Sequence, residues 1–356
     1  MKNIFCIKPK GYNVGNDAIF KGMQHFLYEA LGESVNLISL PATSKYESHQ
    51  NAGLVSSTIH QINQFGHGVI VGGGNLYENG ELDIDLNALN ALSAPLMIFS
   101  VSYGRIYDRK HQFVRRTDAM SDEKIIAINE KAFLSLSRDY TTDHYLKKLG
   151  CSKSQFGGCP TIFLDRILPS LISSPQKGGY VLLSIRNPNL MNIPLDKQAE
   201  VRGDILDIID FLQRQGLHDI RLLCHDHRDI SFAASFAGME YIYTGDTHRY
   251  FSILRNCSLN ISYRLHATLP CMAFGVPSIK ISYDERAISL MNSLGLGEWN
   301  IEQMNVPSVL DAVKDRYQRL DSYKTMLSEL RPEWEKIYTN FQSSFQQFAD
   351  EVTKRA

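Results

Sequence analysis

The sequence lacks the charge balance of a general nucleic-acid or membrane-surface binder. Its 356 residues include 37 lysines and arginines against 38 aspartates and glutamates, which gives a formal net charge of −1. Proteins that bind nucleic acids or anionic lipids broadly carry a clear basic excess. We therefore expect no nucleic-acid partner, while local basic clusters stay compatible with this balance.

Paired cysteines and long apolar runs are absent too. The six cysteines form no Cys-x-x-Cys pair, and several lie inside apolar runs such as "NIFCI" and "RLLCH". This usage is typical of reduced, buried thiols in a cytoplasmic protein. No run approaches the roughly 18 apolar residues of a membrane span. The start, "MKNIFCIKPK", has too short an apolar core for a signal peptide and predicts a first strand.

What the chain does contain is a regular alternation of short β-rich runs and helical patterns. The alternation predicts parallel βαβ units covered by helices, and the length favours two domains. We expect an α/β fold with two Rossmann-like, doubly wound domains facing a cleft. A stretch rich in proline, serine and glycine at 171–179 predicts the linker. The expected parts are an N-terminal domain (1–172), a C-terminal domain (173–330) and a helical tail (331–356).

Two cationic side chains follow one predicted strand of the second domain. The strand at 259–263 ends next to Arg264 and His266, and a helix is expected from Ala267. Ligands of such sheets bind at the carboxyl ends of the strands. A guanidinium, an imidazole and a helix N-terminus at this edge make an anion site. The alternative is a solvated arginine and a helix-capping histidine, because an Arg-x-His spacing alone is common.

Further motifs make the sequence resemble the polysaccharide pyruvyltransferase family. The family's C-terminal signature corresponds to Arg264-Leu265-His266-Ala267, Gly275-Val276-Pro277 and Tyr283-Asp284. The segments "NVGNDAI", "VIVGGGNLY", "SLSRDYTTDHYLKKLG" and "LLSIR" look like its other motifs, in the expected order. Two departures are that Asp17 is displaced by one residue and that Cys159-Pro160 replaces an Asp-Pro pair.

The resemblance implies transfer of a pyruvyl group from phosphoenolpyruvate to a sugar, with formation of a cyclic ketal. It also implies a fold similar to glycosyltransferase type B and a role in exopolysaccharide or cell-wall biosynthesis. The expected partners are phosphoenolpyruvate, as a substrate and not a cofactor, and a saccharide acceptor that is free or attached to a lipid. The expected location is the cytoplasm, at the inner membrane face if the acceptor is lipid-linked. The C-terminal helices either pack on the first domain or touch a membrane.

The predicted catalytic residues are His266, Arg264 and Asp17. Phosphoenolpyruvate carries a carboxylate and a phosphate, and arginine binds both through paired hydrogen bonds. We expect Arg186 and Arg264 to hold this donor, while His266 contacts the phosphate or moves a proton. Asp17 and Asn16 are expected to face the acceptor, although Asp17 is equally suited to cap the following helix.

The other predicted substrate-binding residues carry two interpretations each. Glycines at the end of a strand either admit a phosphate or form a tight turn. His225, beside His227, either lies in a solvated loop or contacts phosphate or sugar; a metal is less expected than either, and no metal ligands are assigned. Tyr103 either stacks on a sugar ring or packs in the core. These residues are Gly72, Gly73, Gly74, Asn75, His225 and Tyr103.

Two other functions fit the same expected frame, because fold does not fix function. A nucleotide-sugar glycosyltransferase would need an acidic residue for the ribose, and Asp284 or Glu285 has the right place. A non-catalytic sugar-binding protein is the third interpretation. A dehydrogenase is not expected, because no Gly-x-Gly-x-x-Gly motif follows the first strand. The sequence carries no signal for an oligomeric state.

Overall fold

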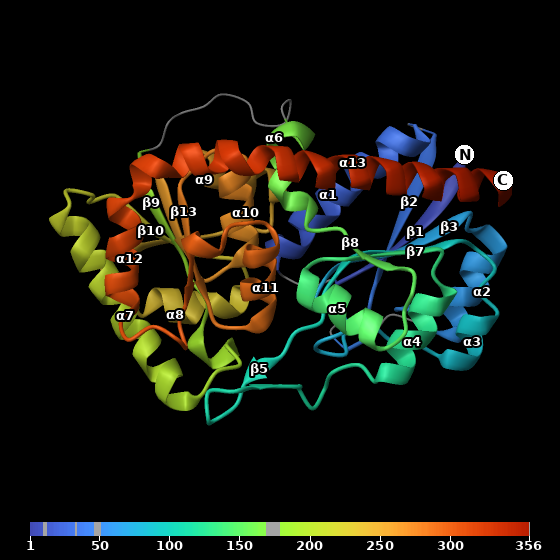
Figure 1. Ribbon diagram of the computed structural model, residues 1–356, viewed down its shortest axis with the longest axis horizontal. Helices are drawn as coiled ribbons and strands as arrows, with labels where there is room; N and C mark the ends of the chain where they lie inside the picture. The colour runs from blue at the N-terminus through green and yellow to red at the C-terminus, as the bar shows by residue number, and fades with distance from the viewer. Residues whose placement is uncertain (10–12, 33, 46–50, 169–178, 356) are drawn as a thin grey trace.

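The computed structural model describes residues 1–9, 13–32, 34–45, 51–168 and 179–355, and two parallel sheets form its framework (Figure 1). The first sheet has the strand order β2-β1-β3-β4-β7-β8. The predicted linker and the 172/173 boundary lie in a segment outside the described residues, apart from Gly179. The strands are β1 (Lys2–Lys8), β2 (Val35–Pro41), β3 (Gly68–Gly74), β4 (Leu96–Val101), β7 (Leu134–Ser137) and β8 (Ser154–Phe156).

The second sheet has the strand order β11-β10-β9-β12-β13-β14. Counted along this half of the chain, that is the order 3-2-1-4-5-6 of a dinucleotide-binding fold. The predicted α/β class with two Rossmann-like domains is therefore confirmed. We call the parts built on the two sheets the first and the second domain. The strands are β9 (Val181–Ser184), β10 (Ile220–Cys224), β11 (Glu240–Tyr243), β12 (Leu259–Ser262), β13 (Ser278–Ser282) and β14 (Asn300–Glu302).

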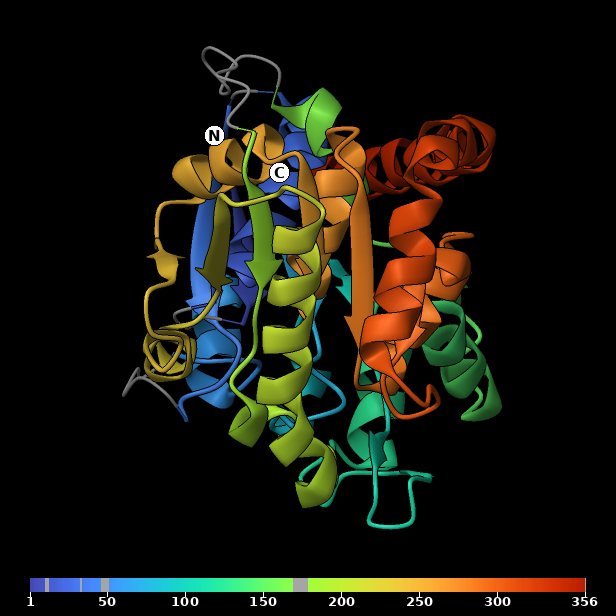
Figure 2. The same cartoon turned by 90° about the vertical axis from the view of Figure 1, so that its left-hand side faces the viewer.

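Helices cover both faces of each sheet, which explains why the strands are apolar along their whole length. In β9, Leu183 packs in one cluster with residues of α7, while Leu182 packs in another with residues of α9 and α10. Figure 2 shows α7 lying in front of the second sheet. The helices are α1 (Val14–Leu31), α2 (Ser56–Phe65), α3 (Leu86–Asn90), α4 (Asp122–Lys131), α5 (Tyr140–Lys148), α6 (Leu164–Ile167), α7 (Leu195–Arg214), α8 (Ile230–Ala234), α9 (Thr247–Asn256), α10 (Leu265–Ala273), α11 (Glu285–Ser293), α12 (Val309–Gln318) and α13 (Tyr323–Arg355).

The last helix, α13, begins at the second domain and runs back across the first (Figure 1). Phe341 and Phe345 lie against Phe26 of α1 and Phe99 of β4. The C-terminal segment thus packs on the first domain, and residue 331, the expected start of a tail, lies inside this helix. Among the described residues, no helix combines the length and hydropathy that a membrane span requires. All six cysteines are buried and unpaired.

Polar contacts join the two domains around the carboxyl ends of their strands. The backbone N–H of Val14, at the start of α1, donates to the carbonyl of His225 at 3.2 Å. A short hairpin of β5 (Ile106–Tyr107) and β6 (Phe113–Val114) follows Arg105, whose side chain and backbone N–H both donate to Glu285. The two sheet edges therefore face each other at close range.

Candidate functional site

A cavity of about 660 Å³ lies between the domains, at the carboxyl ends of the strands of both sheets. This is the place where ligands bind in open α/β sheets. Seven of the eleven predicted site residues line it. They are Asn16, Gly74, Asn75, Arg186, His225, Arg264 and His266.

The two predicted donor-binding arginines lie beside one buried carboxylate. Nη1 of Arg186 lies 3.3 Å from Oδ1 of Asp229, and Nη1 of Arg264 lies 3.9 Å from Oδ2 of the same residue. Asp229 is fully buried, and its Oδ1 also accepts a hydrogen bond from the backbone of Asn187. Burial and the charge of Arg264 lower the pKa of Arg186. Arg186 and Arg264 therefore converge beside Asp229, and Nη1 of Arg186 also lies 3.6 Å from Oδ2 of Asp226.

A third arginine of the cavity was missed by the sequence analysis. Arg138 follows β7 directly, is only 2% exposed, and donates to the hydroxyl of Ser102. Within the described parts of the chain, no carboxylate lies within ion-pair distance of its guanidinium. Burial lowers its pKa, and the charge of Arg286 adds to this effect. A buried guanidinium that lacks a carboxylate is costly unless an anionic ligand supplies the partner.

The cavity wall carries more positive than negative side chains. Among the described residues, seven lysines and arginines line it, against four carboxylates. Lys280 of β13 and Arg286 of α11 belong to the basic set, and neither was predicted as a site residue. The strand-end rule that selected Arg264 applies equally to Arg138, so that residue was accessible to sequence reasoning. No comparable signal marks Lys280, because it lies inside an apolar strand.

Both predicted histidines lie in the cavity with imidazoles that favour the neutral form. Burial and the positive charges of neighbouring arginines hold the pKa of His266 and of His225 well below the ordinary value. Nε2 of His266 is buried without a hydrogen-bond partner in the described structure. The hydroxyl of Tyr250 lies between the two histidines, donating to the carbonyl of His266 and lying 3.4 Å from the ring of His225. His266 therefore has a free nitrogen for a ligand.

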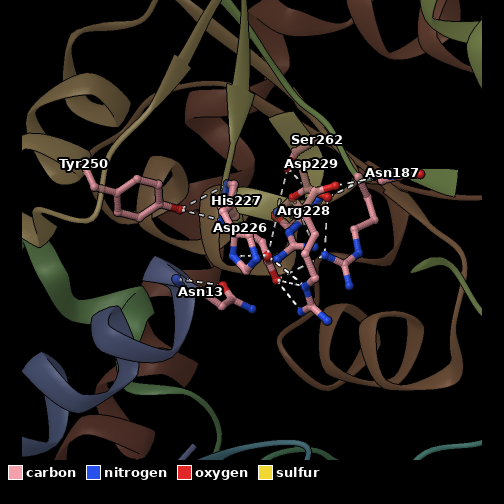
Figure 3. A network of polar contacts seen from close by, with 12 residues as sticks. Asn13, Asn187, Asp226, His227, Arg228, Asp229, Tyr250 and Ser262 are labelled. Atoms are coloured by element: carbon pink, nitrogen blue, oxygen red, sulfur yellow. Dashed lines mark hydrogen bonds and ion pairs between the residues drawn. The ribbon is translucent and has the colours of Figure 1, made fainter. Parts of the chain in front are cut away.

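The segment after β10 forms a dense polar network (Figure 3). Asp226 accepts hydrogen bonds from the backbone and the guanidinium of Arg228, and Asn187 lies beside Asp229. Burial opposes ionisation of Asp226, but the hydrogen bonds from Arg228 outweigh it and lower the pKa to about 2. Among the residues that the structure describes, no group of three or more histidines, cysteines, aspartates or glutamates is arranged to hold a metal ion.

Four predicted site residues do not line the cavity. Asp17 lies in the first turn of α1 and pairs with Lys8 at 2.9 Å. The helix is capped by Asn13 and not by Asp17, because the Asn13 side chain accepts from the N–H of Gly15. The predicted contact of Asp17 with the acceptor therefore has no support in this geometry.

The remaining three have packing roles. A Cβ at Gly72 would lie 3.0 Å from Sδ of Met23, and one at Gly73 would lie 2.9 Å from Ile19, so these glycines let α1 pack closely on β3. Gly74, by contrast, faces the cavity near Asn16. Tyr103 is buried and stacks on Tyr145 with ring centroids 3.9 Å apart, which favours the core interpretation.

Uncharged amide side chains make up another part of the cavity wall. Four come from the first domain or its loops and two from the loop after β9. Amides donate and accept hydrogen bonds, which suits the hydroxyls of a saccharide. These residues are Asn13, Asn16, Asn75, Asn79, Asn189 and Asn192.

Solved structures with a similar fold support this description of the architecture. A putative UDP-N-acetylglucosamine 2-epimerase from Listeria monocytogenes superposes with a TM-score of 0.59 at 12% identity, covering 92% of this chain and 91% of that one. The wall teichoic acid polymerase TagF superposes with a TM-score of 0.51 at 11% identity, covering 99% and 89%. At such identities the likeness concerns the fold alone, which is the two-domain fold of glycosyltransferase type B.

Sequence comparison is more specific. The amylovoran biosynthesis protein AmsJ from Erwinia amylovora is 27% identical over 110 residues, which are 27% of this chain and 26% of that protein. The match thus spans about a quarter of the curated relative's length. The family model described as polysaccharide pyruvyl transferase matches residues 13–285, which include most of the residues that line the cavity and the segment from Arg264 to Asp284. The chain belongs to the polysaccharide pyruvyl transferase family.

Proposed function

We propose that the protein transfers a pyruvyl group from phosphoenolpyruvate to two hydroxyls of a saccharide, forming a cyclic ketal. The observation that carries the proposal is the convergence of Arg138, Arg186 and Arg264 on one cavity, with Asp229 as the carboxylate that two of them share. Three guanidiniums suit a small metabolite that carries both a phosphate and a carboxylate.

The donor fits best against the second domain. Arg264 is the N-cap residue of α10 and makes no side-chain capping bond. No described acceptor binds the backbone N–H groups of Leu265 and His266, so these two are available to an anion. Arg264, Leu265 and His266 all line the cavity. We assign the phosphate of the donor to the start of α10, between Arg186 and Arg264. We assign the carboxylate of the donor to the part of the cavity next to Arg138.

The acceptor fits best between the asparagines and His266. An ideal Cβ on Gly15 would lie 2.9 Å from Cβ of His266, so this histidine stands where the two domains meet. Its neutral imidazole is suited to accept the proton of an attacking hydroxyl. A bound phosphate dianion offsets the positive field of the arginines and thereby raises the pKa of His266, which strengthens it as a base.

The proposed ketal formation uses one general acid and one general base. A proton is added to the terminal carbon of the enol, and the first sugar oxygen bonds to the central carbon while its proton passes to the base. The bond from that carbon to the phosphate oxygen then breaks, and phosphate leaves with its electron pair. The second sugar oxygen bonds to the same carbon, and its proton leaves with the phosphate, which completes the ketal.

In this proposal the reaction takes place in the cytoplasm, on a free saccharide or on one attached to a lipid at the inner membrane face. It needs no cofactor besides the donor. The glycosyltransferase alternative has less support, because its expected ribose-binding carboxylates are already engaged. Asp284 caps α11 and pairs with Arg286, and Glu285 binds Arg105.

The proposal is tested by incubating the protein with phosphoenolpyruvate and a panel of methyl hexosides and methyl N-acetylhexosaminides. We expect phosphate release that depends on one acceptor class, and a product with the methyl resonance of a pyruvyl ketal. Arg186→Met should abolish the release. The matched control is Arg221→Met, since Arg221 pairs with Asp219 at 2.8 Å on the surface and does not line the cavity. Release of UDP from UDP-sugars, with no use of phosphoenolpyruvate, would establish the alternative.

A further inference from the structure

Lys280 is a buried lysine that lines the cavity, and it forms no ion pair with any carboxylate that the structure describes. It lies in the middle of β13 and is 1% exposed. Its Nζ donates to the backbone carbonyl of Ile281 at 2.5 Å. Within the described ranges of the chain, no carboxylate lies within 4.0 Å of this nitrogen. Lysines are almost never buried in this way unless they are paired, so the position calls for a functional explanation.

The sheet register places Lys280 beside the proposed donor site. Lys280 pairs with Ser262 of the neighbouring strand β12, and Ser262 lies two residues before Arg264. The hydroxyl of Ser262 accepts from the backbone N–H of Arg264, which ties the end of β12 to the start of α10. The lysine is therefore held next to the residues to which the proposed function assigns the phosphate.

Among the described cationic side chains of this wall, Lys280 is the one whose pKa lies near neutral pH. Burial lowers its pKa to about 7, with Asp284 opposing the shift and Arg264 and Arg286 reinforcing it. Tyr283, whose ring lies 5.6 Å from Nζ, has a raised pKa and stays protonated. The arginines around it do not release protons at any working pH. An acid matched to the working pH is what proton transfer to carbon requires.

We infer that Lys280 is the general acid that protonates the terminal carbon of phosphoenolpyruvate. This inference rests on the proposed function and adds to it the residue that carries out its first step. The bond from Nζ to hydrogen breaks as the carbon–hydrogen bond forms, and the enol electron pair supplies the new bond. The lysine is left neutral, and it regains its proton from solvent after the ketal and phosphate have left. His266 remains the base on the acceptor side.

The two histidines of the cavity are poorer candidates for this step. Both are held neutral by burial and by the arginines before the donor binds. His225 packs edge-to-face against Tyr250, at a ring distance of 5.2 Å, which fixes its ring. His266 stands at the first-domain side, where the acceptor is expected. Glu78 is a rival acid by pKa, since burial raises its pKa to about 8 against the opposing charge of Arg286. It belongs to the first domain, however, and it is paired with Arg286 at 2.6 Å.

The test compares Lys280→Met, which has no proton to give, with Lys280→Arg, which keeps the charge but holds its proton. The control is Lys314→Met, at an exposed lysine of α12 that pairs with Asp311. Phosphoenolpyruvate binding is measured by calorimetry. Turnover is measured as phosphate release, with the methyl glycoside that wild type uses or, without an acceptor, as slow hydrolysis of the donor. We expect both Lys280 variants to bind the donor while kcat falls by about 100- to 10,000-fold.

The outcomes separate the inference from the proposed function. If wild type neither binds nor consumes phosphoenolpyruvate, the proposed function is wrong and the inference fails with it. If wild type is active and Lys280→Arg retains its kcat, the lysine supplies only charge and the inference is overturned. If the variants do not fold, the pH profile of wild type decides. Its kcat must fall as pH rises through the pKa of the lysine in the donor complex, and a profile without this alkaline limb contradicts the inference.

Discussion

The guanidinium of Arg286 lies 2.6 Å from the carboxylate of Glu78, and this ion pair joins the second domain to the first across the cavity. Arg286 also pairs with Asp284 of its own domain at 2.6 Å. Its neighbour Glu285 reaches the first domain as well, where it binds Arg105. The first turn of α11 thus contributes one basic and one acidic side chain that each bind a residue of the first domain. These two contacts hold the sheet edges together around the cavity.

Glu78→Gln should weaken this contact between the domains. Glu78 is 2% exposed, so the pair is little screened by solvent, and burial raises the pKa of Glu78 to about 8 against the charge of Arg286. Stability is therefore compared at pH 9, where the carboxylate is ionised and Arg286 keeps Asp284 as a partner. We expect the free energy of unfolding to fall by about 1–3 kcal/mol. Urea denaturation measures it, with Glu335→Gln as control, because Glu335 pairs with Arg166 at the surface and should cost about 1 kcal/mol or less. Equal stability of Glu78→Gln and wild type would show that the pair does not hold the domains.

Arg138→Met should weaken ligand binding without lowering the stability of the ligand-free protein. The substitution removes a buried guanidinium that has no carboxylate beside it, so the ligand-free protein should keep its stability or gain about 1 kcal/mol. Binding of phosphoenolpyruvate should weaken at least about tenfold, the equivalent of one charge-assisted hydrogen bond. Thermal unfolding without ligand and calorimetric titration measure the two effects. A variant that is strongly destabilised and still binds the donor normally would make Arg138 a structural residue.

Lys280→Met should change how stability depends on pH. The folded pKa of Lys280, about 7, lies below the unfolded value near 10.5, so the unfolded chain binds more protons between these limits. Wild-type stability therefore gains from this group as pH rises through that window, and loses as pH falls toward 7. We expect the stability of wild type minus that of Lys280→Met to increase between pH 7 and pH 10, by an amount on the order of a few kcal/mol. A constant difference would mean that the lysine titrates normally.

Asp17→Asn should have little effect on turnover. The carboxylate of Asp17 is about a third exposed and pairs with Lys8 outside the cavity. We expect changes of about 1 kcal/mol or less in the free energy of unfolding and in the barrier of kcat/KM. Steady-state kinetics with phosphoenolpyruvate measure the second quantity. If Asp17→Asn lost as much activity as His266→Ala, Asp17 would be a catalytic residue after all.

The strands and the two donor arginines could be predicted because local pattern decides them. Apolar runs such as 181–184, bounded by turn signals and alternating with helical patterns, indicate buried strands. A charged residue within two positions of a strand end lies at the sheet edge, as Arg186 and Arg264 do. Arg138 obeys the same rule and was overlooked. The hairpin around β5 and β6 was not predicted, since each strand has only two residues and is too short to show a period-two pattern.

Other parts of the site depend on tertiary contacts that no local pattern encodes. For Gly72 and Gly73 the sequence left a phosphate contact and a tight turn open, and neither interpretation included the close approach of α1 that explains them. Lys280 is a single charge within an apolar strand, and only the register with β12 brings it beside Arg264. The path of α13 back to the first domain is likewise set by packing against Phe26 and Phe99 and not by its own periodicity.

The most direct test is calorimetric titration of the protein with phosphoenolpyruvate, for wild type and for Arg264→Ala. Arg186 continues to partner Asp229 in the variant, so its melting temperature should stay within a few degrees of wild type. We expect one donor site per chain in wild type, with an affinity that falls as salt is added. In Arg264→Ala we expect the affinity for phosphoenolpyruvate to be lower by about 10- to 100-fold. Donor affinity unchanged in a folded Arg264→Ala, or failure of that variant to fold, would contradict the claim that this arginine cluster binds the donor.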